Sequence, residues 1–323
     1  MNRDDIRLDG PRGRAAGPPV PGAAVPGAAV PGAAVPGAAV PGGRQSGDPA
    51  VPDAFTSRAA AENFPVALRL LPARTRQQLM AVYWFARVTD DTGDTGRPAD
   101  RLRLLDDLES DLRELPGGAP RRPEVRALRP VIADCGVPVG LFADLIAANR
   151  QDQLISRYPA FDDLLGYCRL SANPVGRIVL HIFGSFSLAA AVLSDNVCTA
   201  LQLVEHWQDV AEDFRAGRVY LPQDDLARYG CTEADLGAAR ASAQLRSLIA
   251  FECGRAAGLL DAGAPLVGSL RGSSRAAIAG YVAGGRSALV AVAAADYDVL
   301  PGAPRPRRTR QAAELALAYL RGR

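Results

Sequence analysis

The chain has 323 residues, 48% of them hydrophobic, which is enough for a large apolar core in one or two domains. Its formal net charge is only +2, with arginine as the sole basic side chain besides two histidines, so the composition argues against a nucleic-acid-binding protein. The five cysteines lack metal-binding spacing, and their odd number favours a reduced, cytoplasmic environment.

Residues 1–55 differ in composition from the rest of the chain. The pentapeptide Val-Pro-Gly-Ala-Ala occurs four times in succession between residues 20 and 39. A five-residue period with Pro-Gly in every copy favours successive turns over a helix or a sheet. We therefore expect a disordered low-complexity tail over residues 1–55 and one folded domain over residues 56–323.

Apolar residues recur at helical spacing through most of the folded domain, and the alternating runs typical of strands are nearly absent. The spacing predicts a helix that leads into residues 90–94, followed by helices at 102–115, 137–149, 161–170, 175–193, 200–216, 234–262, 274–296 and 310–320. The segment 175–193 is interpreted as a buried core helix and not as a membrane span. The expected fold class is all-α.

The first chemically informative feature is an acidic cluster at residues 90–94. Asp90 and Asp94 lie four residues apart, which places them on one face of a helix, and Arg87 lies three residues before Asp90 on the same side. Carboxylate oxygens suit Mg²⁺, which often bridges a protein to substrate phosphates. A solvated helix end is the simpler alternative for such a cluster taken alone.

A second cluster lies 119 positions further along the chain. Gln202, Glu205, Asp209 and Asp213 follow one another at spacings of three, four and four residues, so they form one polar stripe on a predominantly apolar helix. A polar stripe in apolar surroundings favours a face that lines a cavity, although an exposed amphipathic surface would give the same pattern. Two acidic faces opposed across a cavity could hold Mg²⁺ ions and a diphosphate between them.

The amino-acid sequence around both clusters resembles that of the squalene/phytoene synthase family over residues 62–300. The matching segments are residues 62–67 with 70–72, 83–94, 167–169, 171–176, 201–203, 207–213 and 217–222. Two of these, Glu62-Asn63-Phe64-Pro65 and Ser171-Ala172-Asn173-Pro174-Val175-Gly176, are most similar to the bacterial hydroxysqualene synthase branch of hopanoid biosynthesis.

The resemblance implies an isoprenoid-synthase-like helical bundle around a deep central cavity, with Mg²⁺ as the cofactor. The implied metal-binding and catalytic carboxylates are Asp90, Asp94, Asp209 and Asp213. By similarity the groups nearest the diphosphate are Asn63, Arg87 and Arg218, and those lining the reaction cavity are Tyr167, Gln202, Tyr220 and Tyr281. Tyr167 is also implied to be catalytic, near the departing group, although a packed core tyrosine is a fair alternative.

The second cluster departs from the family pattern at one point. The family usually has Asn four residues before the first aspartate of this motif, and this chain has Glu205 followed by His206. Glu205 either adds a charged metal ligand or turns away from the site. His206 is open to three interpretations: a local base, a partner of Glu205, or a packed histidine beside Trp207.

The implied reaction is ionisation of presqualene diphosphate, rearrangement of the cation, and quenching by water to give hydroxysqualene and diphosphate. The first alternative is head-to-head condensation of two prenyl diphosphates, such as farnesyl diphosphate, to presqualene diphosphate, squalene or phytoene. The second is a non-catalytic helical scaffold or assembly factor. We expect a cytoplasmic protein; peripheral contact with the inner face of the membrane and with other hopanoid-pathway enzymes is left open.

Overall fold

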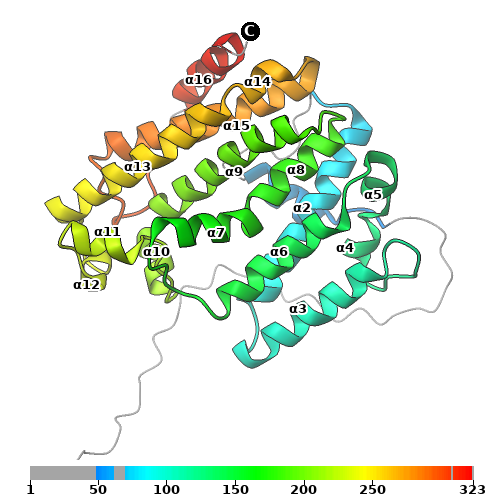
Figure 1. Cartoon of the computed structure of the whole chain (residues 1–323), viewed down its shortest axis with the longest axis horizontal. Helices are drawn as coiled ribbons and strands as arrows, with labels where there is room; N and C mark the ends of the chain where they lie inside the picture. The colour runs from blue at the N-terminus through cyan, green and yellow to red at the C-terminus, as the bar shows by residue number, and fades with distance from the viewer. Residues whose placement is uncertain (1–48, 62–69, 307, 322–323) are drawn as a thin grey trace, which may run out of the picture. The chain divides into compact units, whose positions relative to one another are not determined.

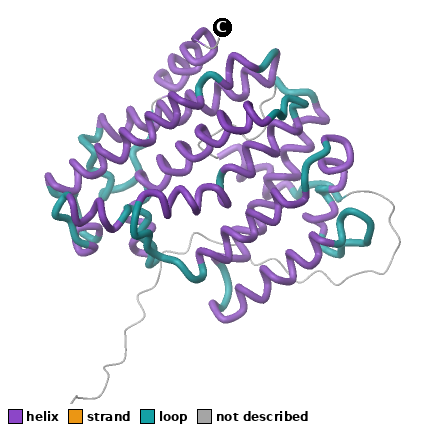
Figure 2. Tube along the Cα trace, in the orientation of Figure 1, coloured by secondary structure: helices purple, strands orange, loops and turns teal. Residues whose placement is uncertain are grey.

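The computed structural model describes residues 49–61, 70–306 and 308–321, which belong to one compact unit, Gly47–Arg323. The predicted tail up to residue 48 and the motif residues 62–69 lie outside the described residues. Within the described residues every regular element is helical, and an isolated β-bridge joins Arg157 to Val219. The all-α fold class is therefore confirmed (Figures 1 and 2).

The first half of the chain contributes α1 (Asp53–Ala61), α2 (Ala73–Asp94), α3 (Pro98–Arg113), α4 (Pro123–Arg126), α5 (Arg129–Cys135), α6 (Val139–Asp152), α7 (Phe161–Ser171) and α8 (Asn173–Ile182). The second half contributes α9 (Leu188–Gln208), α10 (Val210–Arg215), α11 (Gln223–Arg228), α12 (Glu233–Leu236), α13 (Ala243–Gly263), α14 (Leu266–Ser269), α15 (Gly272–Ala294) and α16 (Arg308–Arg321).

Helix α9 occupies the middle of the bundle. It packs against α13 and α15 on one side and against α7 and α8 on the other, while α6 lies between α7 and α3 (Figure 1). Val197 and Ala200 of this helix belong to one apolar core, and Leu203, Val204 and Trp207, further along it, belong to another. Gln202 and Glu205, the part of the predicted polar stripe that lies on α9, are half-buried among these apolar neighbours.

The prediction of one continuous helix over residues 175–193 is wrong. The structure ends α8 at Ile182 and begins α9 at Leu188, with Gly184 between them at a φ of +61°. A positive φ is accessible to glycine without steric cost, so the chain reverses here. Ser187 then caps α9, its hydroxyl accepting a hydrogen bond from the Ala190 N–H at 3.1 Å.

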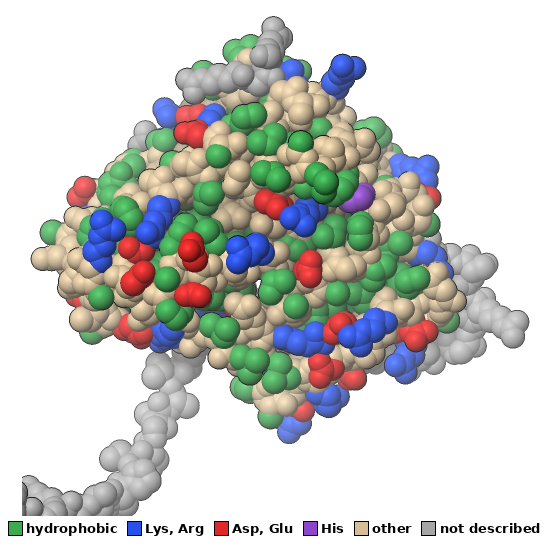
Figure 3. Space-filling model, viewed as in Figure 1, with side chains coloured by type: hydrophobic (Ala, Val, Ile, Leu, Met, Phe, Trp, Pro, Cys, Tyr) green, Lys and Arg blue, Asp and Glu red, His purple; other side chains and the backbone are tan. Residues whose placement is uncertain are grey.

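Two helices, Leu188–Gln208 and Gly272–Ala294, are long and apolar enough to cross a membrane by length and composition alone. Both lie against α13 within the bundle, which accounts for their apolar character through packing in the core. On the face seen in Figure 3, acidic and basic side chains lie close to one another. Arg150, for example, pairs with both Asp106 and Glu109 of α3.

Candidate active site

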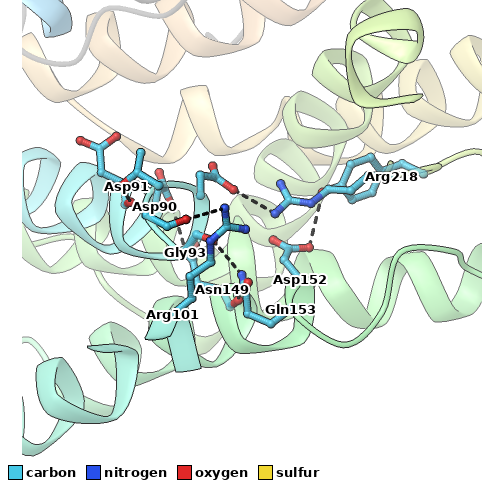
Figure 4. A network of polar contacts seen from close by, with 12 residues as sticks. Asp90, Asp91, Gly93, Arg101, Asn149, Asp152, Gln153 and Arg218 are labelled. Atoms are coloured by element: carbon cyan, nitrogen blue, oxygen red, sulfur yellow. Dashed lines mark hydrogen bonds and ion pairs between the residues drawn. The ribbon is translucent and has the colours of Figure 1, made fainter. Parts of the chain in front are cut away.

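The first acidic cluster lies at the carboxyl end of α2, where this helix meets α6. Asn149 of α6 donates a hydrogen bond from its side-chain amide to Asp90 Oδ1 at 3.1 Å and a second to the Leu145 carbonyl at 3.2 Å. Gln153, one turn further on, donates to the Gly93 carbonyl at 2.9 Å. Figure 4 shows these amides facing the end of α2. The cluster is therefore fixed by packing of α2 on α6 and is not a free helix end.

Glycine at position 93 permits this close approach. A Cβ atom at Gly93 would lie 2.5 Å from Asn149 Oδ1, well inside van der Waals contact. Gly93 is buried, and the displaced atom belongs to the amide that holds Asp90. The glycine within the acidic cluster thus sets the distance between α2 and α6.

Asp90 is a carboxyl group in an unfavourable place for a negative charge. Burial raises its pKa to about 6, and the neighbouring Asp94 and Asp91 carboxylates act in the same direction. The hydrogen bond from Asn149 and the charge of Arg87 oppose this shift. A cation bound at Asp90 would relieve the repulsion and favour the ionised form.

The second acidic cluster lies at a break between two helices. The sequence predicts one helix over residues 200–216, but α9 ends at Gln208 and α10 begins at Val210. Asp209 stands at the junction, where its carbonyl accepts the N–H groups of Glu212 and Asp213 at 2.9 and 2.8 Å. Burial raises the pKa of Asp209, and the nearby Asp213 and Glu212 carboxylates add to the rise. Carboxylates are therefore crowded here, as at Asp90.

Arg218 joins the two clusters. Its backbone N–H donates to the Asp213 carbonyl at 2.8 Å, and its side chain donates from Nη2 to Asp94 Oδ1 at 2.9 Å. Figure 4 shows the guanidinium reaching from its own segment toward the end of α2. Two acidic segments that are 119 positions apart in sequence are thus both hydrogen-bonded to Arg218, the first through its side chain and the second through its backbone.

Asp152, at the carboxyl end of α6, is a central residue of the site that sequence reasoning missed. Tyr167 donates its hydroxyl proton to Asp152 Oδ2 at 2.8 Å, and Tyr220 donates to Oδ1 at 3.4 Å. Burial raises the pKa of Asp152, whereas the hydrogen bond from Tyr167 and the charge of Arg218 oppose the rise. The available signal was the polar run Asn149–Gln153 at the end of an otherwise apolar helix.

An aromatic cluster surrounds this carboxylate. The rings of Tyr158, Tyr167 and Tyr220 lie 5.7 to 5.8 Å apart, centroid to centroid, and His206 stacks on Tyr220 at 3.7 Å. Gln202 Nε2 lies 3.2 Å from His206 Nε2. The structure therefore brings the predicted residues Tyr167, Gln202 and Tyr220 together.

His206 is buried, with 7% of its surface exposed, and belongs to the aromatic cluster. Its Nδ1 lies 3.8 Å from Oδ2 of Asp213, a residue of the second cluster. His206 is thus packed, and its roles as a base and as a partner of Glu205 stay predictions. Glu205 is half-buried on α9, and its carbonyl accepts the Asp209 N–H at 3.0 Å. Its role as a ligand stays a prediction.

Two predicted site residues lie apart from this polar network. Tyr281 is on α15 and packs at the edge of the other apolar core, where burial raises its pKa and Cys198 of α9 is a neighbour. Asn63 falls within residues 62–69, outside the described residues. The placement of Tyr281 in the cavity wall therefore remains a prediction. The placement of Asn63 near the diphosphate is a prediction as well.

The donor set fits Mg²⁺ together with a diphosphate. Within residues 49–61, 70–306 and 308–321, no three His, Cys, Asp or Glu side chains are close enough to form a metal centre by themselves. Mg²⁺ usually binds one or two carboxylates and completes its shell with water and substrate phosphate, so a ready-made cage is not required. The Nε atoms of Arg87 and Arg101 are buried without a hydrogen-bond partner, as expected of donors that await an anion.

A model of the family described as squalene/phytoene synthase matches residues 57–312. The hydroxysqualene synthase of Sinorhizobium fredii is 38% identical over 213 residues, covering 65% of this chain and 72% of that protein. The phytoene synthase of Mycobacterium tuberculosis is 34% identical over 227 residues, covering 69% of this chain and 74% of that protein.

Solved structures agree with the sequence relatives. The squalene synthase HpnC of Alicyclobacillus acidocaldarius is 38% identical, with a TM-score of 0.70 over 76% of this chain and 94% of that one. A dehydrosqualene synthase in complex with a ligand is 26% identical, with a TM-score of 0.76 over 84% of this chain and 96% of that one. This chain therefore belongs to the squalene/phytoene synthase family and is an isoprenoid enzyme of that type.

Proposed function

We propose that the enzyme ionises presqualene diphosphate in a Mg²⁺-dependent reaction and quenches the rearranged cation with water, giving hydroxysqualene and diphosphate. The observation that carries the proposal is the meeting of two acidic segments across Arg218, which bonds to Asp94 and follows Asp213. Relatives named hydroxysqualene synthase at 38–39% identity support the choice of reaction.

The acidic residues of this chain would serve the departing diphosphate. Asp90, Asp94, Asp209 and Asp213 would hold Mg²⁺, which when bound neutralises charge that develops on the leaving oxygens. Arg218 and Arg87 would contact the diphosphate directly, because a guanidinium donates several hydrogen bonds to phosphate oxygens. Because Asp90 and Asp209 are buried, the diphosphate would leave from a poorly solvated site, where electrostatic interactions are strong.

The apolar part of the chain would protect the cation. Helices α9 and α15 present long apolar surfaces, and the aromatic rings of Tyr158, Tyr167 and Tyr220 adjoin the acidic clusters. Such walls delay attack by water until the rearrangement is complete. The product alcohol then requires one water molecule to reach the cation in a defined place.

Two other functions compete with this proposal. Phytoene synthases at 34% identity favour head-to-head condensation of two prenyl diphosphates as the second candidate. A non-catalytic scaffold is the third, and it is disfavoured because all four aspartates are present and Arg218 is hydrogen-bonded to both acidic segments. Each candidate predicts a different product.

Product analysis separates these functions. The purified enzyme is incubated with presqualene diphosphate, or with farnesyl diphosphate alone, with Mg²⁺ and with excess chelator. We expect hydroxysqualene from presqualene diphosphate only when Mg²⁺ is present, and one ¹⁸O atom in the alcohol when the reaction runs in H₂¹⁸O. Formation of a C30 or C40 hydrocarbon in place of the alcohol would favour condensation, and no diphosphate release from any substrate would favour the scaffold.

A further inference from the structure

The carboxylate of Asp152 is occupied by two tyrosine hydroxyls, one on each oxygen. Tyr167 reaches Oδ2 at 2.8 Å and Tyr220 reaches Oδ1 at 3.4 Å. The three residues come from α6, from α7 and from the segment after α10, so the arrangement depends on the tertiary fold. Both tyrosines are buried, each with 6% of its surface exposed. The binding and release of diphosphate proposed above do not use the Asp152 carboxylate.

The direction of these hydrogen bonds determines what the tyrosines can do. An ionised carboxylate only accepts, so each hydroxyl proton points toward Asp152. The remaining lone pairs of Tyr167 and Tyr220 therefore point away from Asp152. A phenol in this orientation accepts a hydrogen bond from water, whereas a phenol with its proton turned outward would donate one.

The surroundings of Asp152 suit a group that takes up a proton. Burial raises its pKa above the ordinary aspartate value, which favours protonation. Asp94 acts in the same direction, whereas the hydrogen bond from Tyr167, followed by Arg218 and His206, lowers the pKa and keeps the carboxylate form accessible. The short bond to Tyr167 provides a direct path for one proton.

We propose that Asp152 is a positioning residue that orients Tyr167 as the acceptor for the quenching water and takes up the displaced proton. The proposal rests on the water-quenching function proposed above. In this step the water oxygen bonds to the carbocation and gives one proton to the Tyr167 oxygen, while Tyr167 passes its own proton to Asp152 Oδ2. The products are the alcohol, neutral Tyr167 and protonated Asp152, which returns to the carboxylate when its proton leaves to solvent.

Substitution of Asp152 by Asn provides the test. Asn can accept from one tyrosine but must donate to the other, so it disturbs the orientation of the hydroxyls and cannot take up a proton. The full-length enzyme is given presqualene diphosphate and Mg²⁺, and released diphosphate and the ratio of alcohol to hydrocarbon products are measured. For D152N we expect diphosphate release to fall severalfold at most, whereas the alcohol share of the products falls on the order of tenfold or more.

Two further variants guard against a merely structural effect. Tyr167→Phe keeps the ring and removes the hydroxyl, so it should lower the alcohol share to the same extent, and combining it with Asp152→Asn should add little. Asp162→Asn removes an exposed carboxylate from the first turn of α7, the helix of Tyr167, and should leave the ratio unchanged. If Asp152→Asn does not fold, Tyr167→Phe alone decides.

The outcomes for the two proposals are separable. A wild-type enzyme that makes no alcohol from presqualene diphosphate overturns the proposed function. A wild-type enzyme that makes the alcohol, together with an unchanged product ratio in Asp152→Asn or in Tyr167→Phe, overturns the role of Asp152 alone. A fall in diphosphate release with an unchanged ratio also overturns it, because the substitution would then act on ionisation and not on the quenching step.

Discussion

Arg218 is the residue that is hydrogen-bonded to both acidic segments, and its position predicts a role for its charge in catalysis. Its guanidinium bonds to Asp94, and its backbone bonds to the segment that carries Asp213. Burial lowers the pKa of Arg218, but the carboxylates of Asp152 and Asp94 outweigh this effect and raise it, so Arg218 stays protonated throughout the working pH range. It is therefore a permanent positive charge that pairs with the first acidic cluster and is attached through its backbone to the second.

Replacing Arg218 by Gln should remove a stabilising charge from the departing diphosphate. We expect turnover with presqualene diphosphate to fall about 100-fold or more, with a rise in KM, because preorganised donors to a developing anion contribute that much. Arg215→Gln, an exposed arginine at the end of α10, is the matched control and should change turnover little. Steady-state kinetics at saturating Mg²⁺ measure both parameters. Wild-type kinetics in Arg218→Gln would remove the arginine from the diphosphate site.

Glu205 and Asp209 lie one helical turn apart and should respond differently to loss of charge. Glu205→Asn restores the residue usual in the family, so we expect activity to be retained. Asp209→Asn removes a predicted metal ligand at a buried junction, so turnover should fall at least about 100-fold even in excess Mg²⁺. Diphosphate release across a Mg²⁺ titration checks both variants. An inactive Glu205→Asn enzyme would show that this position is not tolerant and that Glu205 is required.

At the scale of elements, contact between α2 and α6 determines the shape of the first cluster. Gly93→Ala would place a Cβ atom 2.5 Å from Asn149 Oδ1 and displace the amide that holds Asp90. We expect about 1–3 kcal/mol of destabilisation from overpacking, together with weaker activity. The control is Gly258→Ala on α13, where no atom lies within 4 Å and helix propensity predicts a gain of about 1 kcal/mol. Urea unfolding measures both changes, and an unaltered midpoint for Gly93→Ala would contradict the close approach.

Elements with one apolar face are the part of this fold that the sequence predicts well. Helices α2, α3, α6 and α7 each overlap a predicted segment because their apolar residues recur at helical spacing. The predicted helix 234–262 is wrong in one respect, because residues 237–242 divide it into α12 and α13. The breaks are harder to predict. The turn at Gly184 interrupts a continuous apolar run, and the junction at Asp209 interrupts a continuous polar stripe, so neither changes the local pattern. Helix α1 lies before the segment in which helices were expected.

In the candidate site, too, some residues could be predicted from local sequence spacing and others could not. Asp90 with Asp94, and Asp209 with Asp213, were found because a spacing of one helical turn is visible in the sequence. Asp152 was missed because its partners Tyr167 and Tyr220 are 15 and 68 positions away. Asn149 and Asp90 are 59 positions apart. Such pairs depend on how the helices pack, and no local spacing encodes them.

At the scale of the whole molecule, a buried ionic cluster between α11 and α13 links stability to pH. Arg255 bonds to Asp225 at 2.5 Å and to Glu252 at 3.0 Å, and its guanidinium lies 4.3 Å from the ring centroids of Phe161 and Phe251. One arginine thus serves two carboxyl groups. Glu252 is fully buried, and its Oε2 atom has no hydrogen-bond partner. The cluster is therefore short of one positive charge or one proton.

Glu252 should make the folded protein less stable as pH rises. Burial raises its pKa from 4.5 to about 8, and the Asp225 carboxylate contributes while Arg255 opposes the shift. Between these two values the folded protein holds a proton that the unfolded chain releases, so the contribution of Glu252 is complete below pH 4.5 and is lost as pH rises through 8. The slope for one proton is at most about 1.4 kcal/mol per pH unit.

The Glu252→Gln variant carries a permanently neutral side chain and should lack this slope. We expect the wild-type Tm to fall relative to that of Glu252→Gln between pH 5 and 8, with the variant more stable at pH 8. Glu233→Gln is the control: Arg157 lowers the pKa of Glu233 from 4.5, so its small contribution is lost only below that pH, and no slope relative to wild type is expected between pH 5 and 8. Tm values of the three proteins across this pH range decide the matter. Parallel curves for wild type and Glu252→Gln would mean that Glu252 is already ionised in the folded protein at pH 5, with Arg255 outweighing the cost of burial.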